Sequence, residues 1–236
     1  MDKATGALGV NIVRKGTARE LVELEYLAAF LREFHVDCVF DVGANKGRYA
    51  ECVRRLEFRG KIISFEPVPF LAAELRDKAR FDPAWVIEEV ALDEEVRDVT
   101  FNVMAHSSLS SMYDPKSYMK EFSVVQKLSL RTGTLKTYFD KYSEGFRRPF
   151  LKLDTQGAEI AISKGAGDRL SRFVGLQSEL SFEPNYRDQI QYRDAIEFFE
   201  SQGFALTALV PNGFHFPELI ELDCFMYNTR VSHAAS

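Results

Sequence analysis

The sequence predicts an α/β fold in which a mostly parallel sheet carries helices on both faces and has an antiparallel strand at its edge. Short apolar runs alternate with segments of helical spacing, a pattern that is typical of parallel strands connected by helices. The last two apolar runs, at residues 204–210 and 219–228, follow each other directly and predict an antiparallel pair.

The first half of the chain begins with an amphipathic helix, because leucine and phenylalanine recur at helical spacing from Leu21 to Phe34. A strand, helix and strand unit follows, and its second strand is closed by a proline. The elements predicted here are a strand at 36–43, a helix at 47–58, a strand at 61–67, a helix at about 70–79 and strands at 85–92 and 96–103.

Residues from about 104 to 133 show little clean periodicity, so we expect a long loop with one strand near residues 124–130. Loops of this length often serve as lids or binding segments. From Pro149 the alternation resumes. The elements predicted here are a strand at 150–154, a mainly helical segment at 157–170, a strand at 172–180, a helix at about 189–202 and the two final strands.

The composition indicates one domain. Of the 236 residues, 46% are hydrophobic, which suffices for one sizeable core. We expect this domain to span residues 18–230, after a flexible extension at residues 1–17 that mixes glycine, threonine and charge without period.

Charge and cysteine content bear on partners and compartment. The net charge of −5 argues against nucleic acid and anionic lipid surfaces as partners. Three cysteines without CxxC spacing indicate neither a disulfide framework nor a zinc site. No window supplies the roughly 18 uninterrupted apolar residues of a membrane span. We therefore expect a cytoplasmic protein without membrane or nucleic-acid partners.

Acidic residues follow several predicted strands, since Asp41, Glu66, Asp154 and Glu179 each lie at or near the end of a separate apolar run. Ligands of open α/β sheets bind beyond the carboxyl ends of the strands. Crowded carboxylates raise one another's pKa unless a cation or hydrogen-bond donors compensate. A sulfonium cofactor with ribose hydroxyls supplies both. The alternative is that acidic residues end strands because loops are solvated.

The first turn, DVGANKG at residues 41–47, resembles a nucleoside-binding loop. Gly43 and Gly47 allow a sharp turn, and the next helix offers free N–H groups to a carboxylate, while Asp41 could accept from an ammonium group. Glu66 follows Gly43 by 23 residues, close to the spacing of about 20 at which an acidic side chain binds ribose hydroxyls. The GxGxxG of dinucleotide enzymes is absent because position 45 is Asn.

A second constellation is LKLDTQGAE at residues 151–159, where Lys152 and Asp154 share one side of the strand. A buried lysine needs an acidic partner. In one interpretation Lys152 pairs with Asp154 or Glu179 to organise the sheet, and Glu159 favours a helix N-terminus. In the other, Asp154 and Lys152 position an acceptor hydroxyl beside a transferring methyl group. We favour the second for Asp154, and both stay open for Lys152.

His106 lies in the irregular segment among four serines, so it is a candidate general base toward a hydroxyl, although a solvated loop histidine is the alternative. No spacing of His, Cys and carboxylates indicates a transition metal. Mg²⁺ held by Asp154 and Glu179 is conceivable because both would face the same crevice, but the sequence does not indicate it.

Taken in order, these blocks resemble the FkbM-type S-adenosylmethionine-dependent methyltransferases, many of which modify hydroxyls on sugars or natural products. The matching blocks are FDVGANKGRYA (40–50), ISFEPVP (63–69), ALDEE (91–95), SSL (107–109), LKLDTQGAEIAISKGA (151–166) and the acid in QSEL (177–180). They span residues 36–182, and LKLDTQGAEIAISKGA resembles the most specific signature of the family. From about residue 183 onward no block can be transferred.

The resemblance implies a Rossmann-like, class I methyltransferase fold with S-adenosylmethionine as cofactor. The cofactor contacts it implies are Asp41, Gly43, Asn45, Gly47, Glu66, Pro67, Ser108 and, through its backbone, Ala91. It also implies that Lys152, Asp154 and Glu159 shape the reaction centre. One departure is that Thr155 and Gln156 stand where family members often carry Val and Glu, which removes a carboxylate from the turn.

The predicted function is methyl transfer to a hydroxyl of a small-molecule or carbohydrate acceptor, with Asp154 or His106 taking the proton and Glu179 as a further catalytic candidate. An NAD-dependent oxidoreductase is argued against by the missing third glycine and the FEPVP turn. A catalytically silent nucleotide-binding module that regulates a partner is the rival from another class. The aromatic stretches 198–199 and 214–216 could serve a homodimer, with a role in the core as the alternative.

Overall fold

The computed structural model describes residues 18–116, 123–215 and 217–231. The predicted N-terminal extension lies outside these residues. The main-sheet strands are β1 (Cys38–Val42), β2 (Lys61–Phe65), β3 (Trp85–Glu88), β8 (Pro149–Leu153), β9 (Gly175–Ser181), β10 (Phe204–His215) and β11 (Glu218–Asn228). The helices are α1 (Ala18–Glu33), α2 (Arg48–Arg55), α3 (Pro69–Ala79), α4 (Leu135–Tyr142), α5 (Glu159–Lys164) and α6 (Tyr192–Ser201).

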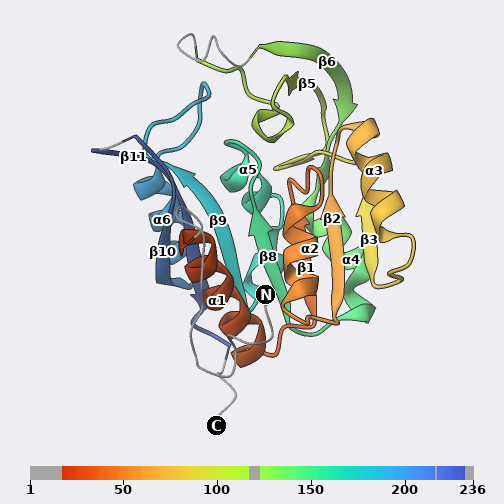
Figure 1. The fold of residues 1–236 in the computed structure, drawn as a ribbon, viewed down its shortest axis with the longest axis vertical. Helices are drawn as coiled ribbons and strands as arrows, with labels where there is room; N and C mark the ends of the chain where they lie inside the picture. Colours follow the sequence, from red (N-terminus) through yellow and green to blue (C-terminus); the bar gives the residue numbers. More distant parts are fainter. Residues whose placement is uncertain (1–17, 117–122, 216, 232–236) are drawn as a thin grey trace.

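The seven strands form one twisted sheet in the order β10-β11-β9-β8-β1-β2-β3 (Figure 1). Within this sheet β9, β8, β1, β2 and β3 pair in parallel, whereas β11 is antiparallel to both of its neighbours. The predicted fold class is confirmed, with one correction: the antiparallel strand is β11, second from the edge, and β10 forms the edge itself. After β9 the chain crosses through α6 to β10 at the edge of the sheet. It then turns back, so that β11 lies between β10 and β9.

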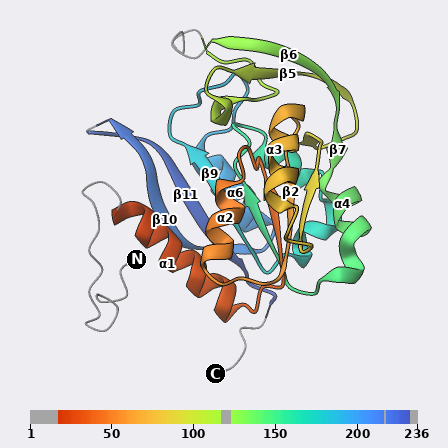
Figure 2. The same cartoon turned by 45° about the vertical axis from the view of Figure 1, so that its right-hand side comes forward.

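Helices cover both faces of the sheet because successive side chains of the buried strands point to opposite sides (Figure 2). In β1, Val39 packs in the core with α1, α2 and α3, and Phe40 packs in the core with α4, α5 and α6. Both side chains are fully buried, and burial of such a side chain contributes roughly 1.5–3 kcal/mol. The same alternation in β8 places Phe150 on the first face and Leu151 on the second.

A separate two-stranded hairpin lies over the carboxyl ends of the main strands, at the top of Figure 1. It pairs β5 (Asp98–Met104) with β6 (Val124–Arg131), which confirms the strands predicted at 96–103 and 124–130. Phe101 and Val103 anchor it on Val68 and Leu71 at the start of α3. The segment between the strands carries a short 3₁₀ helix, η2 (Ser107–Leu109), and residues 117–122 lie outside the described part.

Three local features differ from the prediction. The strand predicted at 85–92 ends at Glu88, because the amide of Val90 turns back to the carbonyl of Glu88 at 3.1 Å, and a two-residue strand, β4 (Leu92–Asp93), follows. The helical segment at 157–170 divides into α5 and the 3₁₀ helix η4 (Gly167–Arg172). The sequence pattern does not predict α4, which follows the short strand β7 (Gly133–Thr134) and is capped by Thr134.

The aromatic pair predicted as an alternative dimer surface belongs to the core. Phe199 is fully buried and Phe198 packs against the same cluster. Residue 216 and the side chains of residues 213–215 lie outside the description. Across the described ranges, no helix is long and apolar enough to cross a membrane.

Candidate active site

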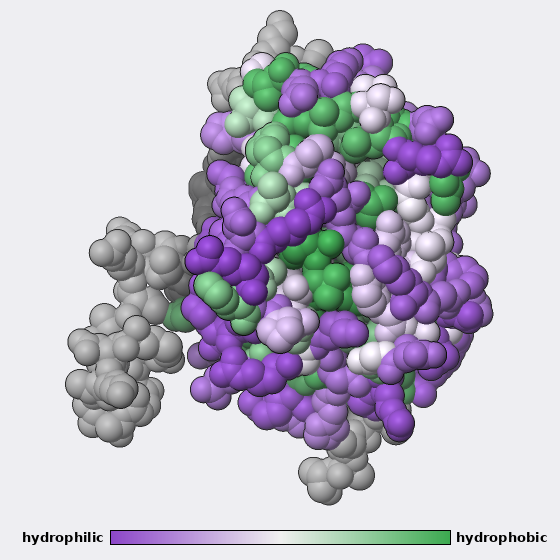
Figure 3. Space-filling view, turned by 90° about the vertical axis from the view of Figure 1, so that its right-hand side faces the viewer, coloured by the Kyte–Doolittle hydropathy of each residue, from purple (hydrophilic) through white to green (hydrophobic). Residues whose placement is uncertain are grey.

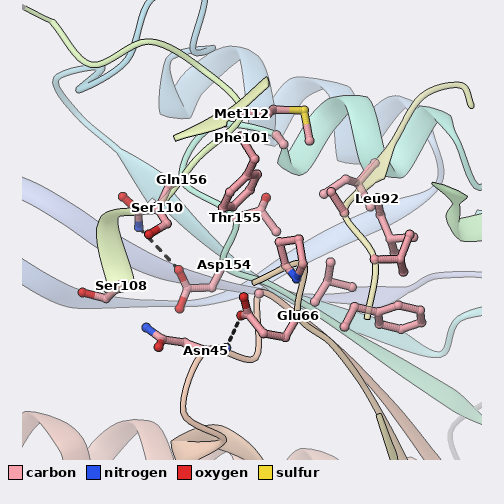
Figure 4. A pocket seen from close by; sticks show the side chains of 18 of the residues that line it. Asn45, Glu66, Leu92, Phe101, Ser108, Ser110, Met112, Asp154, Thr155 and Gln156 are labelled. Atoms are coloured by element: carbon pink, nitrogen blue, oxygen red, sulfur yellow. Dashed lines mark hydrogen bonds between the residues drawn. The ribbon is translucent and has the colours of Figure 1, made fainter. Parts of the chain in front are cut away.

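A cavity lies at the carboxyl ends of β1, β2 and β8, where the first turn, Glu66 and the segment after β8 meet (Figure 4). Its empty space is about 600 Å³, a figure that includes solvent at its open mouth. Six of the eight predicted cofactor residues line it, namely Gly43, Asn45, Glu66, Pro67, Ala91 and Ser108, together with Asp154. The apolar part of its lining includes Phe65, Val90, Leu92, Phe101, Met112 and Ile162.

The two glycines of the first turn have different roles. Gly43 lines the cavity with φ of 80°, and a Cβ there would lie 1.8 Å from the carbonyl oxygen of Asp154, so only glycine fits where the two segments touch. Gly47, with φ of 77°, precedes α2, and its Cβ would lie 2.6 Å from Leu75. It packs behind the turn and does not line the cavity, so its role is to shape the loop.

Glu66 holds the first turn from the end of β2. Its carboxylate accepts hydrogen bonds from the amides of Asn45 at 2.8 Å and Val68 at 2.9 Å, and only 4% of the residue is exposed (Figure 4). Burial raises the pKa of Glu66 to about 7, although the amides of Val68 and Asn45 oppose the shift. The carboxylate therefore changes its charge near neutral pH while facing the cavity.

The serine-rich segment around η2 is hydrogen-bonded to the first turn and to the segment after β8. The hydroxyl of Ser107 donates to the side-chain oxygen of Asn45 at 2.9 Å, and that of Ser111 donates to the carbonyl of Gln156 at 2.9 Å. The loop predicted as a lid or binding segment therefore borders the cavity along with the hairpin. Ser107 was not among the predicted site residues, although it stands next to Ser108 in the SSL block.

Asp41, predicted to contact the cofactor directly, instead has its carboxylate turned onto the α1–α2 face of the sheet. It is fully buried, does not line this cavity, accepts from Ser64 at 3.0 Å and lies 3.3 Å from Lys152. The reason is register, because Asp41 of β1 and Lys152 of β8 are paired neighbours whose side chains emerge on the same face.

Lys152 connects this buried carboxylate to the cavity. Its ammonium lies 3.5 Å from Asp154, donates to the carbonyl of Gly43 at 3.2 Å and lies 5.3 Å from the ring centre of Tyr49. Burial alone would lower the pKa of Lys152, but Asp154 and Asp41 outweigh burial and raise it. Lys152 therefore stays protonated. The pairing of Lys152 with Asp154 that the first interpretation expected is present, and its role in positioning an acceptor hydroxyl stays a prediction.

Gln156 lies between the carboxylates of Asp154 and Glu179. Its amide nitrogen is 2.6 Å from Glu179 and 3.4 Å from Asp154, and Asn212 donates to the other oxygen of Glu179 at 2.6 Å. Burial and then Asp154 raise the pKa of Glu179 well above its ordinary value. Glu179 thus lies behind Gln156 and outside the lining of the cavity, whereas Asp154 is within that lining with its side chain 40% exposed.

Glu159 begins α5 and closes the turn after β8. Its carboxylate accepts from the amides of Thr155 at 2.9 Å and Gly157 at 3.1 Å, and from the hydroxyl of Thr155 at 3.0 Å. It does not line this cavity. Its contacts therefore fix the shape of the turn that carries Asp154 and Gln156.

A second, more open cleft adjoins the cavity on the side of α1 and α2. The two share the lining residues Gly43, Asn45, Ser107, Ser108 and Asp154. Lys152 and His106 line only the second cleft. The structure thus places three of the four predicted catalytic residues around one opening, with Asp154 at the border between the two spaces.

The polar floor of the second cleft is a hydrogen-bonded group that sequence reasoning missed. The side chain of Gln177 accepts from the hydroxyl of Tyr49 at 3.0 Å, and donates to Glu23 at 2.9 Å and Asp223 at 3.1 Å. Burial and then Glu23 raise the pKa of Asp223 to about 7. The sequence signal for this group was that Gln177 and Asp223 are polar residues inside apolar strands.

No three His, Cys, Asp or Glu side chains within the described ranges are arranged to hold a metal ion. The three cysteines are free thiols, and Cys38 and Cys224 are buried. Neither observation assigns a metal to Asp154 or Glu179.

Comparison with known proteins places this geometry in a family. The family model described as the Methyltransferase FkbM domain matches residues 41–206. The 2-O-methyltransferase NoeI of Sinorhizobium fredii is 24% identical over 204 residues, which cover 82% of this chain and 80% of that protein.

Two solved methyltransferase structures are similar to this chain at low sequence identity. An rRNA methylase from Streptococcus thermophilus is 9% identical and has a TM-score of 0.50, with 93% of this chain and 99% of that chain covered. The magnesium protoporphyrin IX methyltransferase of Synechocystis, solved with bound S-adenosylmethionine, is 10% identical with a TM-score of 0.48 and coverage of 93% and 87%. Since the family match spans well over half of the sequence, including the glycine turn, Glu66 and Asp154, the chain belongs to the FkbM methyltransferase family.

Proposed function

We propose that this protein transfers the methyl group of S-adenosylmethionine to a hydroxyl of a sugar or natural-product acceptor. The observation that carries the proposal is that Asp154 borders two adjoining spaces, so ligands in the cavity and in the second cleft would meet beside its carboxylate. Membership of the FkbM family supports methyl transfer. The name of the related NoeI, a 2-O-methyltransferase, supports an oxygen acceptor.

The residues of the cavity fit the proposed cofactor. Glu66 offers a buried carboxylate to ribose hydroxyls, and the apolar lining around Ala91 and Leu92 suits an adenine ring. Gly43 brings the backbone of β1 and the segment after β8 into contact without a side chain in between. Asp154 adds a negative charge at the border where the sulfonium would lie.

The chemistry needs one proton acceptor. S-adenosylmethionine, when bound, supplies a methyl group that the acceptor oxygen takes as the carbon–sulfur bond breaks. In our proposal Asp154 accepts the proton of the attacking hydroxyl, and His106 on the rim of the second cleft is the alternative base. Lys152 holds Asp154 in place, and positioning of donor and acceptor supplies much of the rate. Gln156 links Asp154 to Glu179, the buried carboxylate behind it.

The partner in this proposal is a small molecule or a carbohydrate. The net charge of −5 gives no broad attraction for phosphate backbones. The polar floor of Tyr49, Gln177 and Asp223 offers both donors and acceptors, as hydroxyl groups require.

Calorimetric titration of the wild type with S-adenosylmethionine and with NADH tests the cofactor. We expect micromolar binding of the first, none of NADH, and loss of binding in Glu66→Ala. Glu25→Ala is the control, because Glu25 is an exposed glutamate on α1. Binding of NADH instead would indicate an oxidoreductase, and binding of neither ligand would refute the cofactor assignment.

Turnover over a panel of glycosides, measured as S-adenosylhomocysteine release, tests the reaction. We expect release with at least one hydroxylated acceptor and a large loss in Asp154→Asn. Tight cofactor binding without turnover on any acceptor would favour the silent regulatory module.

A further inference from the structure

The second cleft has one apolar wall, formed by Phe70, Leu71, Val103, Met104 and Val125. Leu71, Val103 and Met104 are buried at 1–2% exposure, whereas Phe70 is 56% and Val125 is 62% exposed. Single exposed apolar residues are ordinary on a protein surface. Here Phe70 and Val125 extend a buried apolar patch into the cleft. The lining of the cleft also includes the two candidate bases, Asp154 and His106.

The backbone of the hairpin turns Val125 toward this cleft. Val124 pairs with Met104 and Gln126 pairs with Val103, so Val125 is an extra residue opposite β5, in a β-bulge. Bulges re-aim side chains and are frequent beside active sites. In Figure 3, which shows the side of the molecule that carries α3 and β6, apolar side chains gather in the upper part among hydrophilic ones.

The polar floor of the cleft, described above, adds hydrogen-bonding groups to this apolar wall. It carries Glu23, Tyr49, Gln177 and Asp223, joined by hydrogen bonds through the amide of Gln177. Asp154 lies in the same lining. A ligand that contacts both the apolar wall and the polar floor needs a hydrocarbon part and a hydroxyl-bearing part in one molecule.

We propose that the methyl acceptor is amphiphilic. Its hydrocarbon part, an alkyl chain or an apolar ring, lies on the wall of Phe70 and Val125, and its hydroxylated part faces Tyr49, Gln177 and Asp223 beside Asp154. The inference rests on the proposed function, because it names the class of acceptor for the same site. Burial of each methylene on such a wall strengthens binding about fourfold.

Binding of n-octyl and methyl β-D-glucoside to the full-length protein, titrated below the micellar concentration of the octyl compound, tests this inference without requiring turnover. We expect the wild type to bind the octyl glycoside at least about tenfold more tightly than the methyl glycoside. In Phe70→Ser/Val125→Ser the ratio should fall to within about threefold. Phe81→Ser is the matched control, because Phe81 is 83% exposed and outside the lining of the cleft.

Equal binding of the two glycosides, no detectable binding of either at millimolar concentration, or a ratio that survives in the double variant would overturn the inference. An equal loss of the ratio in Phe81→Ser would also overturn the inference, since the octyl chain would then bind exposed apolar residues outside the cleft. S-adenosylmethionine is titrated in parallel. If the wild type binds S-adenosylmethionine but binds the two glycosides equally, only the amphiphilic acceptor is refuted. If the wild type does not bind S-adenosylmethionine, the proposed function is refuted.

Discussion

The ammonium group of Lys152 lies 3.3 Å from Oδ1 of Asp41 and 3.5 Å from Oδ2 of Asp154, and so joins a fully buried carboxylate to one that borders both the cavity and the cleft. The same group donates to the carbonyl of Gly43. One side chain therefore fixes the end of β1, the end of β8 and the turn between β1 and α2. This relationship explains why a lysine occupies a central strand that is otherwise apolar.

Replacement of Lys152 by Met should cost about 3–5 kcal/mol of unfolding free energy, because Asp41 would be left as a buried charge without its cation. Urea unfolding measures the loss. Lys46→Met is the control, since Lys46 is exposed in the same cleft, and its cost should stay within about 0.5 kcal/mol. Adding Asp41→Asn to Lys152→Met should restore part of the stability. Equal costs for the two lysine variants would contradict the pairing.

Substitution of Gly43 by Ala tests the close approach of the two segments. The new Cβ would lie 1.8 Å from the backbone oxygen of Asp154, at a φ of 80°, so the turn must shift. Gly167→Ala is the matched control, with φ of 53° and no heavy atom within 4 Å of the added Cβ, and its cost should be about 1–2 kcal/mol of backbone strain.

We expect Gly43→Ala to lose clearly more unfolding free energy than Gly167→Ala, and to bind S-adenosylmethionine at least about tenfold more weakly, as the displacement of a site by 1 Å permits. Thermal unfolding and calorimetry measure the two effects. A Gly43→Ala protein as stable as Gly167→Ala would show that the turn has room to relax.

The sequence predicted the main strands and most helices because buried parallel strands and amphipathic helices have distinct periods. It did not predict α4, which lies between the strands predicted at 124–130 and 150–154. Strand ends also placed Glu66 and Asp154 in one region correctly. The direction of the Asp41 carboxylate was not readable, because it depends on pairing with Lys152 across 111 residues of chain. The polar floor was missed since Glu23, Gln177 and Asp223 come from three distant segments.

Gln156→Glu should destabilise the protein at pH 8 by about 1–3 kcal/mol, because the amide that donates to Glu179 and Asp154 would become a third carboxylate. Since protonation of one member of the cluster relieves the repulsion, the deficit should shrink as the pH falls toward 5.5. Urea unfolding at both pH values measures this change. Gln126→Glu, at an exposed position of β6, should show no such recovery. A pH-independent deficit would mean that repulsion is not its cause.

Cofactor binding should weaken as the pH falls through 7, because burial raises the pKa of Glu66 to about 7 and a protonated carboxyl offers ribose hydroxyls a poorer acceptor. Between pH 8 and pH 6 the ionised fraction falls about tenfold, so the dissociation constant should rise by up to about that factor. Glu66→Gln should bind weakly with little dependence on pH, which calorimetry at pH 6, 7 and 8 checks.

The stability of the free protein should respond to Glu66 with the opposite sign. Its pKa is raised in the folded state from an ordinary 4.5 to about 7, so the folded protein retains a proton that the unfolded chain has lost. The contribution of Glu66 to stability therefore grows as the pH falls from about 7 toward 4.5, and is lost as the pH rises through 7. Wild type minus Glu66→Gln, measured by urea unfolding without cofactor, should show this slope. A slope of the other sign would place an unrecognised cation beside Glu66 and remove the basis for the predicted pH dependence of binding.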